Sequence, residues 1–250
     1  MIETLLALLA AHLVGDFPLQ PDVLVRAKRN PAVLLLHVVL QTLLAAAALG
    51  NFTVWPLLAI LAGTHLAMDT IKVWVLGDGL TAFVSDQVVH LLVIVALALA
   101  FPLALAQGQW AHLLVPEALR TYLLGLTLVA AVIAGLQVGA ILVRKVTQPF
   151  SGELAGEIQG LKFGGAYIGV LERALILLLV LLGQPAGVGF MLTAKSILRF
   201  GDVKDSAQRK LTEYIIIGTF LSFGWGLAVA LVTQGAVGYL LHTAPPVSLP

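Results

Sequence analysis

The chain has 250 residues, of which 60% are hydrophobic and 11% are charged, and its formal net charge is +1. Soluble globular domains carry roughly 25% charged residues, so the composition excludes an ordinary soluble domain. The small net charge, without a basic stripe, gives no reason to expect a nucleic-acid partner. The sequence contains no cysteine, so any metal site would have to use histidine and carboxylate ligands.

Long apolar stretches predict an all-α fold, a polytopic transmembrane helical bundle. A spanning helix needs about 20 apolar residues, and on this basis we expect about 8 spans. They are placed at residues 2–17, 31–49, 54–76, 81–106, 119–144, 163–183, 185–200 and 211–233. The first lacks the basic start and the cleavage site of a signal peptide, so we expect it to be retained as a span.

Basic residues are unevenly distributed among the connections between spans. Segments 17–30, 145–162 and 199–210 contain lysine or arginine, whereas 50–53 and 107–118 contain neither. By the positive-inside rule the basic connections face the cytoplasm, which leaves both termini outside it. We therefore expect a multi-pass protein of the inner (plasma) membrane, surrounded by membrane lipids, and we leave open whether it forms a homo-oligomer.

The spans fall into two sets of four. Residues 1–107 form the expected first domain and residues 119–233 the second, followed by a tail at 234–250. Both sets have the same orientation, which resembles a parallel repeat of two four-helix halves, although no residue-level similarity links them.

Seven titratable residues lie inside the first four expected spans. They are His12, Asp16, His37, His65, Asp69, Asp86 and His90. Six of the seven form pairs with a spacing of four, which puts an imidazole and a carboxylate on one helix face. The alternating direction of the spans places all of them at a similar depth, in the cytoplasmic half of the membrane. Since such groups usually face a bundle interior, we expect one common pocket.

Imidazole and carboxylate are natural ligands of zinc, and they also suit manganese or iron. The favoured ligands of a divalent metal are His12, His65, His90 and Asp86 (or Asp69). We expect Asp16 and Asp69 to act as bases or as groups that orient ligands, and His37 as a ligand or a proton shuttle. One metal with orienting carboxylates and two metals with bridging carboxylates both fit the pattern.

Further charges lie at matching depth in the second set of spans. They are Glu172, Arg173, Lys195, Arg199 and Glu213. Arginine and lysine bind phosphate well, so we expect this patch to hold the anionic head group of a lipid or lipid-linked phosphate substrate. Structural explanations stay open. Asp69 could pair with Lys72, and the patch could be a buried charge network that fixes helix register.

Four stretches resemble the signature of a bacterial integral-membrane family known as domain of unknown function 3307. They are HLVGDFPLQ (12–20), LLLH (34–37), HLAMDTIK (65–72) and DQVVH (86–90). The remainder resembles the C-terminal extension of longer members. The resemblance implies a membrane protein and no established activity. The His/Asp pairs are also similar to those of membrane metal-dependent hydrolases and of the alkaline ceramidase and adiponectin-receptor type, whose Ser-x-x-x-His and His-x-x-x-His elements are lacking here.

Three functions follow as hypotheses. The first is a metal-dependent hydrolase that acts on a lipid or lipid-linked substrate from the cytoplasmic side. The second is a transporter or channel for a divalent cation, a proton or a small anion, although the outer halves of the spans are purely apolar. The third is a non-enzymatic membrane scaffold, in which the cluster is a structural polar core.

Overall fold

The structure, a computed structural model, describes residues 1–151, 163–197 and 206–243. Within these ranges the chain is helical and contains no strand, so the expected all-α fold is confirmed. The chain divides into two compact units. The first unit comprises Met1–Ile133 and the chain from Ala236 onward, and the second comprises Ala134–Gly235.

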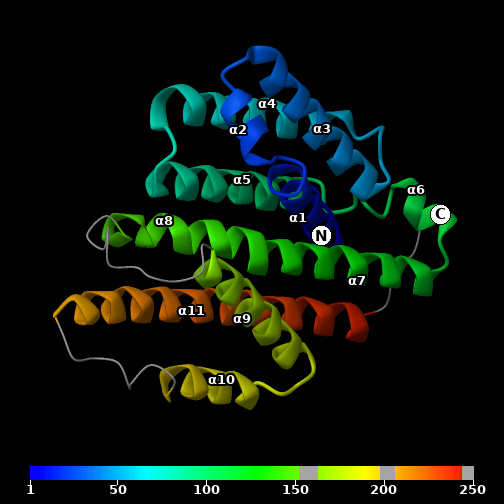
Figure 1. Cartoon of the computed structure of the whole chain (residues 1–250). Helices are drawn as coiled ribbons and strands as arrows, with labels where there is room; N and C mark the ends of the chain where they lie inside the picture. The colour runs from blue at the N-terminus through cyan, green and yellow to red at the C-terminus, as the bar shows by residue number, and fades with distance from the viewer. Residues whose placement is uncertain (152–162, 198–205, 244–250) are drawn as a thin grey trace. The chain divides into compact units, whose positions relative to one another are not determined.

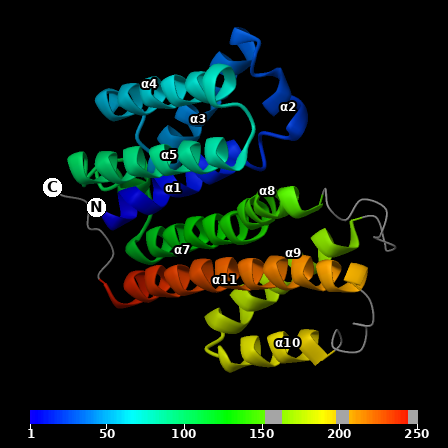
Figure 2. The same ribbon diagram turned by 90° about the vertical axis from the view of Figure 1, so that its left-hand side faces the viewer.

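Four helices of the first unit pack together and carry the titratable residues singled out in the sequence. They are α1 (Ile2–Asp16), α3 (Pro31–Leu49), α4 (Trp55–Ile71) and α5 (Leu80–Ala100). Helix α7 (Pro116–Val132) packs against α1 (Figures 1 and 2). Shorter elements lie in or near the connections: α2 (Asp22–Ala27), the π-helical turn η1 (Lys72–Leu76) and α6 (Gln109–Leu113).

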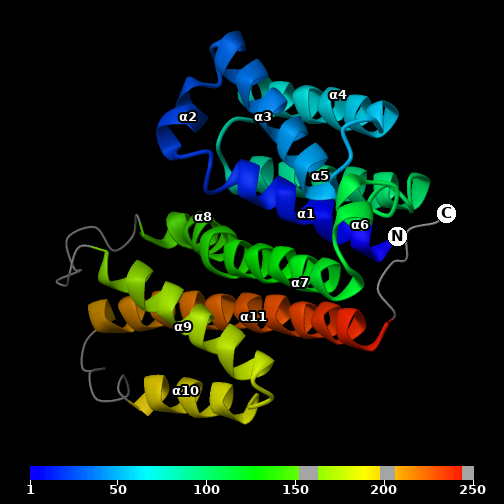
Figure 3. The same cartoon turned by 90° about the vertical axis from the view of Figure 1, so that its right-hand side faces the viewer.

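The second unit contains the remaining helices, in which α9 runs obliquely across α11 (Figure 3). These helices are α8 (Gly139–Ser151), α9 (Gly164–Leu181), α10 (Ala186–Ile197) and α11 (Ser206–His242), whose last residues belong to the first unit. A π-helical turn, η2 (Ile133–Val138), joins α7 to α8. The units therefore divide within a continuous helical run and not at 107–118, because α7 contributes Leu119 and Leu123 to the core of the first unit.

In the described part of the chain, six helices are long and apolar enough to cross a membrane, which is typical of a multi-pass membrane protein. The expected spans 2–17 and 185–200 correspond to α1 and α10, which have 15 and 12 residues and are shorter than a full span. The expected span 81–106 ends early, at Ala100, because Pro102 disfavours a helical conformation of the residue before it.

The apolar core and the polar residues of the first unit occupy opposite ends of the same helices. The core includes Leu6, Ala7, Leu49, Leu57, Ile94 and Leu97. These side chains come from the N-terminal halves of α1 and α4 and from the C-terminal halves of α3 and α5. The titratable residues come from the other halves, so the antiparallel order of the helices gathers them at one end.

The two ends of α3 are fixed by local sequence. At the start, the Asn30 side chain accepts a hydrogen bond from the backbone N–H of Ala32 at 3.0 Å, and Pro31 fills the first helical position. At the end, Gly50 has φ +62°, a left-handed conformation that glycine adopts without steric cost. The beginning of α3 is thereby set a few residues before His37.

A tight backbone contact closes the apolar end of the first unit. The backbone N–H of Gln109 donates to the carbonyl oxygen of Gly50 at 2.6 Å. A Cβ atom at Gly108 would lie 2.3 Å from the carbonyl oxygen of Leu49, a backbone atom that cannot rotate away. Only glycine fits at this position without moving one of the two segments.

We expect Gly108→Ala to lower the midpoint of thermal unfolding in detergent by about 3–10 °C, which corresponds to an overpacking cost of about 1–3 kcal/mol. Gly125→Ala is the matched control, because no atom lies within 4 Å of the added Cβ and alanine is the better helix former. Equal midpoints for the two variants would contradict the close approach at Gly108.

Candidate metal centre

The seven titratable residues of the first unit meet in one buried cluster, as their spacing predicts. None of them is more than 8% exposed. His12 and Asp16 lie at the end of α1 and His65 and Asp69 at the end of α4. The remaining three lie in the first half of α3 or α5. Because these helices run in opposite directions, the ends that carry the residues coincide.

Four ligand atoms form the tightest part of this cluster. The Nε2 atoms of His37 and His65 lie 3.0 Å apart. The Oδ1 atom of Asp16 lies 3.3 and 3.5 Å from these two nitrogens, and the Oδ2 atom of Asp69 lies 3.5 and 3.6 Å from them. Ligands at zinc distance, about 2.0–2.1 Å, in a tetrahedron are about 3.3–3.4 Å apart. We call these four residues the cage.

Neighbouring side chains hold the rings of the cage. The Nδ1 atom of His65 lies 3.1 Å from Nε2 of His90, so the two rings can share a proton while Nε2 of His65 keeps its lone pair for the cage. The amide nitrogen of Gln20 lies 2.9 Å from Nδ1 of His37, the ring nitrogen outside the cage, and 3.1 Å from its Nε2. Metal-binding histidines are typically fixed in this way by a contact at the other ring nitrogen.

His12 lies beside the cage and contacts one of its carboxylates. Its Nδ1 atom is 4.0 Å from Oδ2 of Asp16, and its ring nitrogens lie 3.4 Å from the amides of Gln41 and Gln87. This position suits a residue that orients Asp16 better than one that binds a metal in the cage.

Three buried carboxylate oxygens in the cluster have no hydrogen-bond partner. They are the Oδ1 atoms of Asp16, Asp69 and Asp86. A buried polar atom without a partner is costly, more so when it belongs to a charged group. These oxygens are therefore better suited to a cation than to an apolar core.

Two buried or partly buried lysines balance the carboxylates incompletely. Lys28 Nζ donates to Oδ2 of Asp69 at 2.7 Å, and Lys72 Nζ donates to Oδ2 of Asp86 at 2.5 Å. The pairing of Asp69 with Lys72 considered from the sequence is therefore wrong, because Lys72, the first residue of η1, is directed to α5. With neutral imidazoles, three carboxylates and two ammonium groups leave one excess negative charge in the cluster.

The residues that the sequence favours as ligands are divided among three overlapping groups. Each group has one ligand atom per residue within 4.8 Å of the others: His12–Asp16–His65, His37–His65–Asp69 and Asp69–Asp86–His90. His65 and Asp69 each occur in two groups, whereas the five cage distances centre on His37 and His65, each of which takes part in three of them. His37, expected as a ligand or a proton shuttle, has a ring nitrogen among the four cage atoms.

Sequence reasoning missed Lys28 and three glutamines, Gln20, Gln41 and Gln87. Lys28 is 3% exposed, but its sequence position among other basic residues of a connection gives no sign of burial. The glutamines inside the helices did leave a signal. Gln41 follows His37 by four residues, and Gln87 precedes His90 by three, so each shares a helix face with a cluster residue.

The charged residues expected in the second unit have separate partners. Glu172 pairs with Lys195 at 2.7 Å, and Glu213 pairs with Arg209 in an exposed contact at 3.1 Å. Arg173 is buried and donates to backbone carbonyl groups and a serine. Arg199 lies outside the described residues. Glu213 is therefore not part of a common patch with the others.

We expect Lys28→Met to lower the free energy of unfolding of chelator-treated protein by about 3–5 kcal/mol, because it leaves the Asp69 carboxylate buried without its partner. Arg29→Met is the matched control, since Arg29 is exposed, and its effect should stay within about 0.5 kcal/mol. Both are measured by unfolding in detergent. Equal effects would mean that the buried pair contributes nothing.

Comparisons with known proteins extend to the first unit alone. No curated protein and no solved structure matches the chain. One family model matches, described as protein of unknown function (DUF3307), over residues 4–117. The match includes all seven residues of the cluster and the four helices that carry them. The N-terminal part of the chain, with the candidate metal centre, therefore matches the DUF3307 family model.

Proposed function

We propose that the first unit binds a divalent metal in the cage and acts as a hydrolase on a lipid or lipid-linked substrate. The observation that carries the proposal is the set of five interatomic distances of 3.0–3.6 Å among two imidazole nitrogens and two carboxylate oxygens. This separation suits zinc, and manganese or iron accept the same ligands.

The contact between Lys28 and Asp69 favours a catalytic metal over a structural one. A structural zinc site is closed by four protein ligands, whereas a catalytic site has three and an open position. Lys28 donates to the same Asp69 oxygen that faces the cage, at 2.7 Å. If Lys28 keeps its hydrogen bond to Asp69, the metal has three protein ligands, which are His37, His65 and Asp16. The fourth position is then open and lies next to the Asp69 carboxylate.

A divalent metal with an open position supplies an activated water at neutral pH. Asp69 lies beside that position and would accept a proton from the water as the water oxygen bonds to the carbonyl carbon or the phosphorus of the substrate. The bond to the alcohol then breaks, and Asp69 would return the proton to the departing alcohol oxygen. Lys28 donates to this carboxylate and holds it in place. These roles make Asp69 a base and Asp16 a ligand.

Access to the cage requires movement of a neighbouring segment. A cavity of about 10 Å³ borders His12, His65 and His90, which is room for about one water molecule. Helix α2 has no buried residue, and its Val23 is 76% exposed. The connection that contains α2 also contains Gln20 and Lys28, which touch the cage. We propose that displacement of this connection admits the substrate.

The cellular location belongs to the proposal as well. The basic connections favour the inner membrane, with the cage toward the cytoplasm and both termini on the other side. A lipid substrate would then reach the cage from the inner leaflet.

One observation favours transport as a second candidate function. His37, His65 and His90 form a chain of rings with nitrogen–nitrogen distances of 3.0 and 3.1 Å. Chains of histidines and carboxylates inside a membrane are typical of proton relays and cation pathways. The sealed cage fits a transport intermediate as well as it fits a closed enzyme.

We expect protein purified without a metal-binding tag or chelator to contain about one divalent metal per chain, measured by inductively coupled plasma mass spectrometry. His65→Ala and Asp16→Asn should weaken binding at least tenfold, since even the loss of outer contacts costs about 10–100-fold. His112→Ala is the control, because His112 is exposed and outside the cluster. A content below about 0.1 metal per chain, unchanged by the variants, would sink the proposal.

Asp69→Asn separates catalysis from metal binding. We expect the variant to retain most of its metal and to lose metal-dependent cleavage of lipids in nanodiscs, followed by mass spectrometry of the products. Loss of metal together with activity would instead place Asp69 among the ligands of a closed site. Proton or cation flux into liposomes that depends on His65, without any cleavage product, would favour the transporter.

A further inference from the structure

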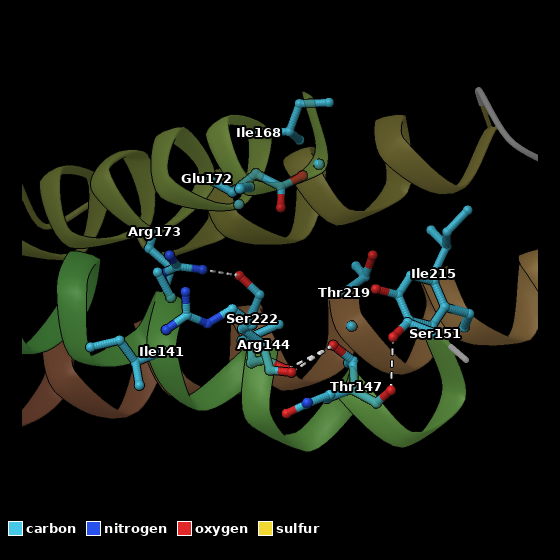
Figure 4. A pocket seen from close by; sticks show the side chains of 18 of the residues that line it. Ile141, Arg144, Thr147, Ser151, Ile168, Glu172, Arg173, Ile215, Thr219 and Ser222 are labelled. Carbon is cyan, nitrogen blue, oxygen red and sulfur yellow. Dashed lines mark hydrogen bonds between the residues drawn. The ribbon is translucent and has the colours of Figure 1, made fainter. Parts of the chain in front are cut away.

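The second unit contains a cavity of about 770 Å³. It is lined by residues of α8, α9, α10 and α11, among them Ile141, Ile168 and Ile215 (Figure 4). Ligand sites for small molecules are typically about 300–1,000 Å³ and mostly apolar, with a few polar groups that fix orientation. This cavity therefore has the size and the lining of a site for an amphiphilic molecule.

Arg173 is the most unusual residue at the wall of this cavity. It is 2% exposed, although it lies inside a helix that is long and apolar enough to cross a membrane. Its guanidinium donates to the carbonyl oxygens of Gly135 and Leu136 at 2.8 and 3.1 Å and to the hydroxyl of Ser222 at 2.8 Å. All three partners are uncharged, so the charge of Arg173 is not neutralised by them.

Two glycines allow the backbone to approach this guanidinium closely. A Cβ atom added at Gly139 would lie 2.8 Å from Nε of Arg173, and one added at Gly169 would lie 3.2 Å from its Nη1. A guanidinium carries five N–H donors, and the contacts within the described residues use three. The remaining donors can bind an acceptor that enters the cavity.

The other charges of the lining compensate Arg173 only in part. Glu172 is the only carboxylate among the described lining residues, and it pairs with Lys195 at 2.7 Å. Arg144 of α8 also lines the cavity and is exposed (Figure 4). Two guanidinium groups therefore remain in excess, which is an electrostatic preference for an anion with an apolar part.

We propose that this cavity binds a membrane phospholipid through its phosphate, with Arg173 and Arg144 as the donors and the apolar part of the wall against the acyl chains. Arginine pairs with phosphate oxygens in a bidentate manner, with charge-assisted hydrogen bonds. The site lies outside the residues matched by the DUF3307 family and outside the cage. It does not depend on whether the cage binds a metal or acts as a hydrolase.

Native mass spectrometry of delipidated protein tests the proposal, with dimyristoylphosphatidylglycerol as the probe. We expect Arg144→Ala to weaken lipid binding about tenfold or more, the effect of losing a hydrogen-bonded charge pair. Arg209→Ala is the matched control, because Arg209 is an exposed arginine of the same unit that does not line the cavity. Equal binding by both variants would overturn the proposal.

Two further variants keep the test independent of folding defects at Arg173. Glu172→Gln frees Lys195 from its partner, so it should strengthen lipid binding several-fold. Gly218→Leu places a side chain in the cavity without changing its charge, and it should weaken binding. No change in either variant would contradict the site.

Inorganic phosphate serves as the second probe and distinguishes the source of the anion. We expect it to compete poorly with the lipid, because it lacks the apolar part that the cavity wall would contact. Binding of inorganic phosphate that is lost in Arg144→Ala, without binding of phosphatidylglycerol, would overturn the lipid as the occupant.

Discussion

The stability of the first unit and its capacity to bind a ligand depend on how the negative charge of its buried carboxylates is compensated. Asp16, Asp69 and Asp86 come from three helices and lie where water is nearly excluded. Such charges are tolerated only when they are paired or bind a cation. Two lysine ammonium groups compensate part of the negative charge, and the negative charge that remains determines what the unit can bind. The same helices pack an apolar core at their other ends, and this core holds the helices in register. The excess negative charge of the carboxylates then favours the binding of a cation.

The sequence was sufficient to predict the all-α fold and the meeting of seven residues, because a spacing of four identifies one helix face and alternating helix directions identify one depth. It was not sufficient to predict the partners within the cluster. The depth of a residue in the membrane does not show how its helix is rotated about its own axis. The pairing of Asp69 with Lys28 could therefore not be distinguished from a pairing with Lys72. The length of α1 and α10 was also uncertain, since short apolar helices look like spans by composition alone.

The second unit illustrates the same limit in a different way. Five charges at one depth predicted a single patch, but pairing within the described residues separates them. Glu172 pairs with Lys195, and Glu213 pairs with an exposed arginine, so neither carboxylate forms an ion pair with Arg173. The basic patch expected from these residues is replaced at the cavity by one ion pair, Glu172–Lys195, beside Arg173 and Arg144. The choice of ion-pair partners depends on which side chains lie four residues apart on one helix or face each other across two helices. The composition of the chain does not determine this choice.

Two of the three acceptors of Arg173 are backbone carbonyl groups of the π-helical turn η2, whose winding is wider than that of an α-helix. Such a turn corresponds to a single additional residue in an otherwise regular helix. Loss of one residue from Ile133–Val138 would restore the regular α-helical winding and withdraw these two oxygens from the guanidinium. A deletion of this size, usually harmless in a loop, would leave a buried cation with the Ser222 hydroxyl as its one remaining partner among the contacts described.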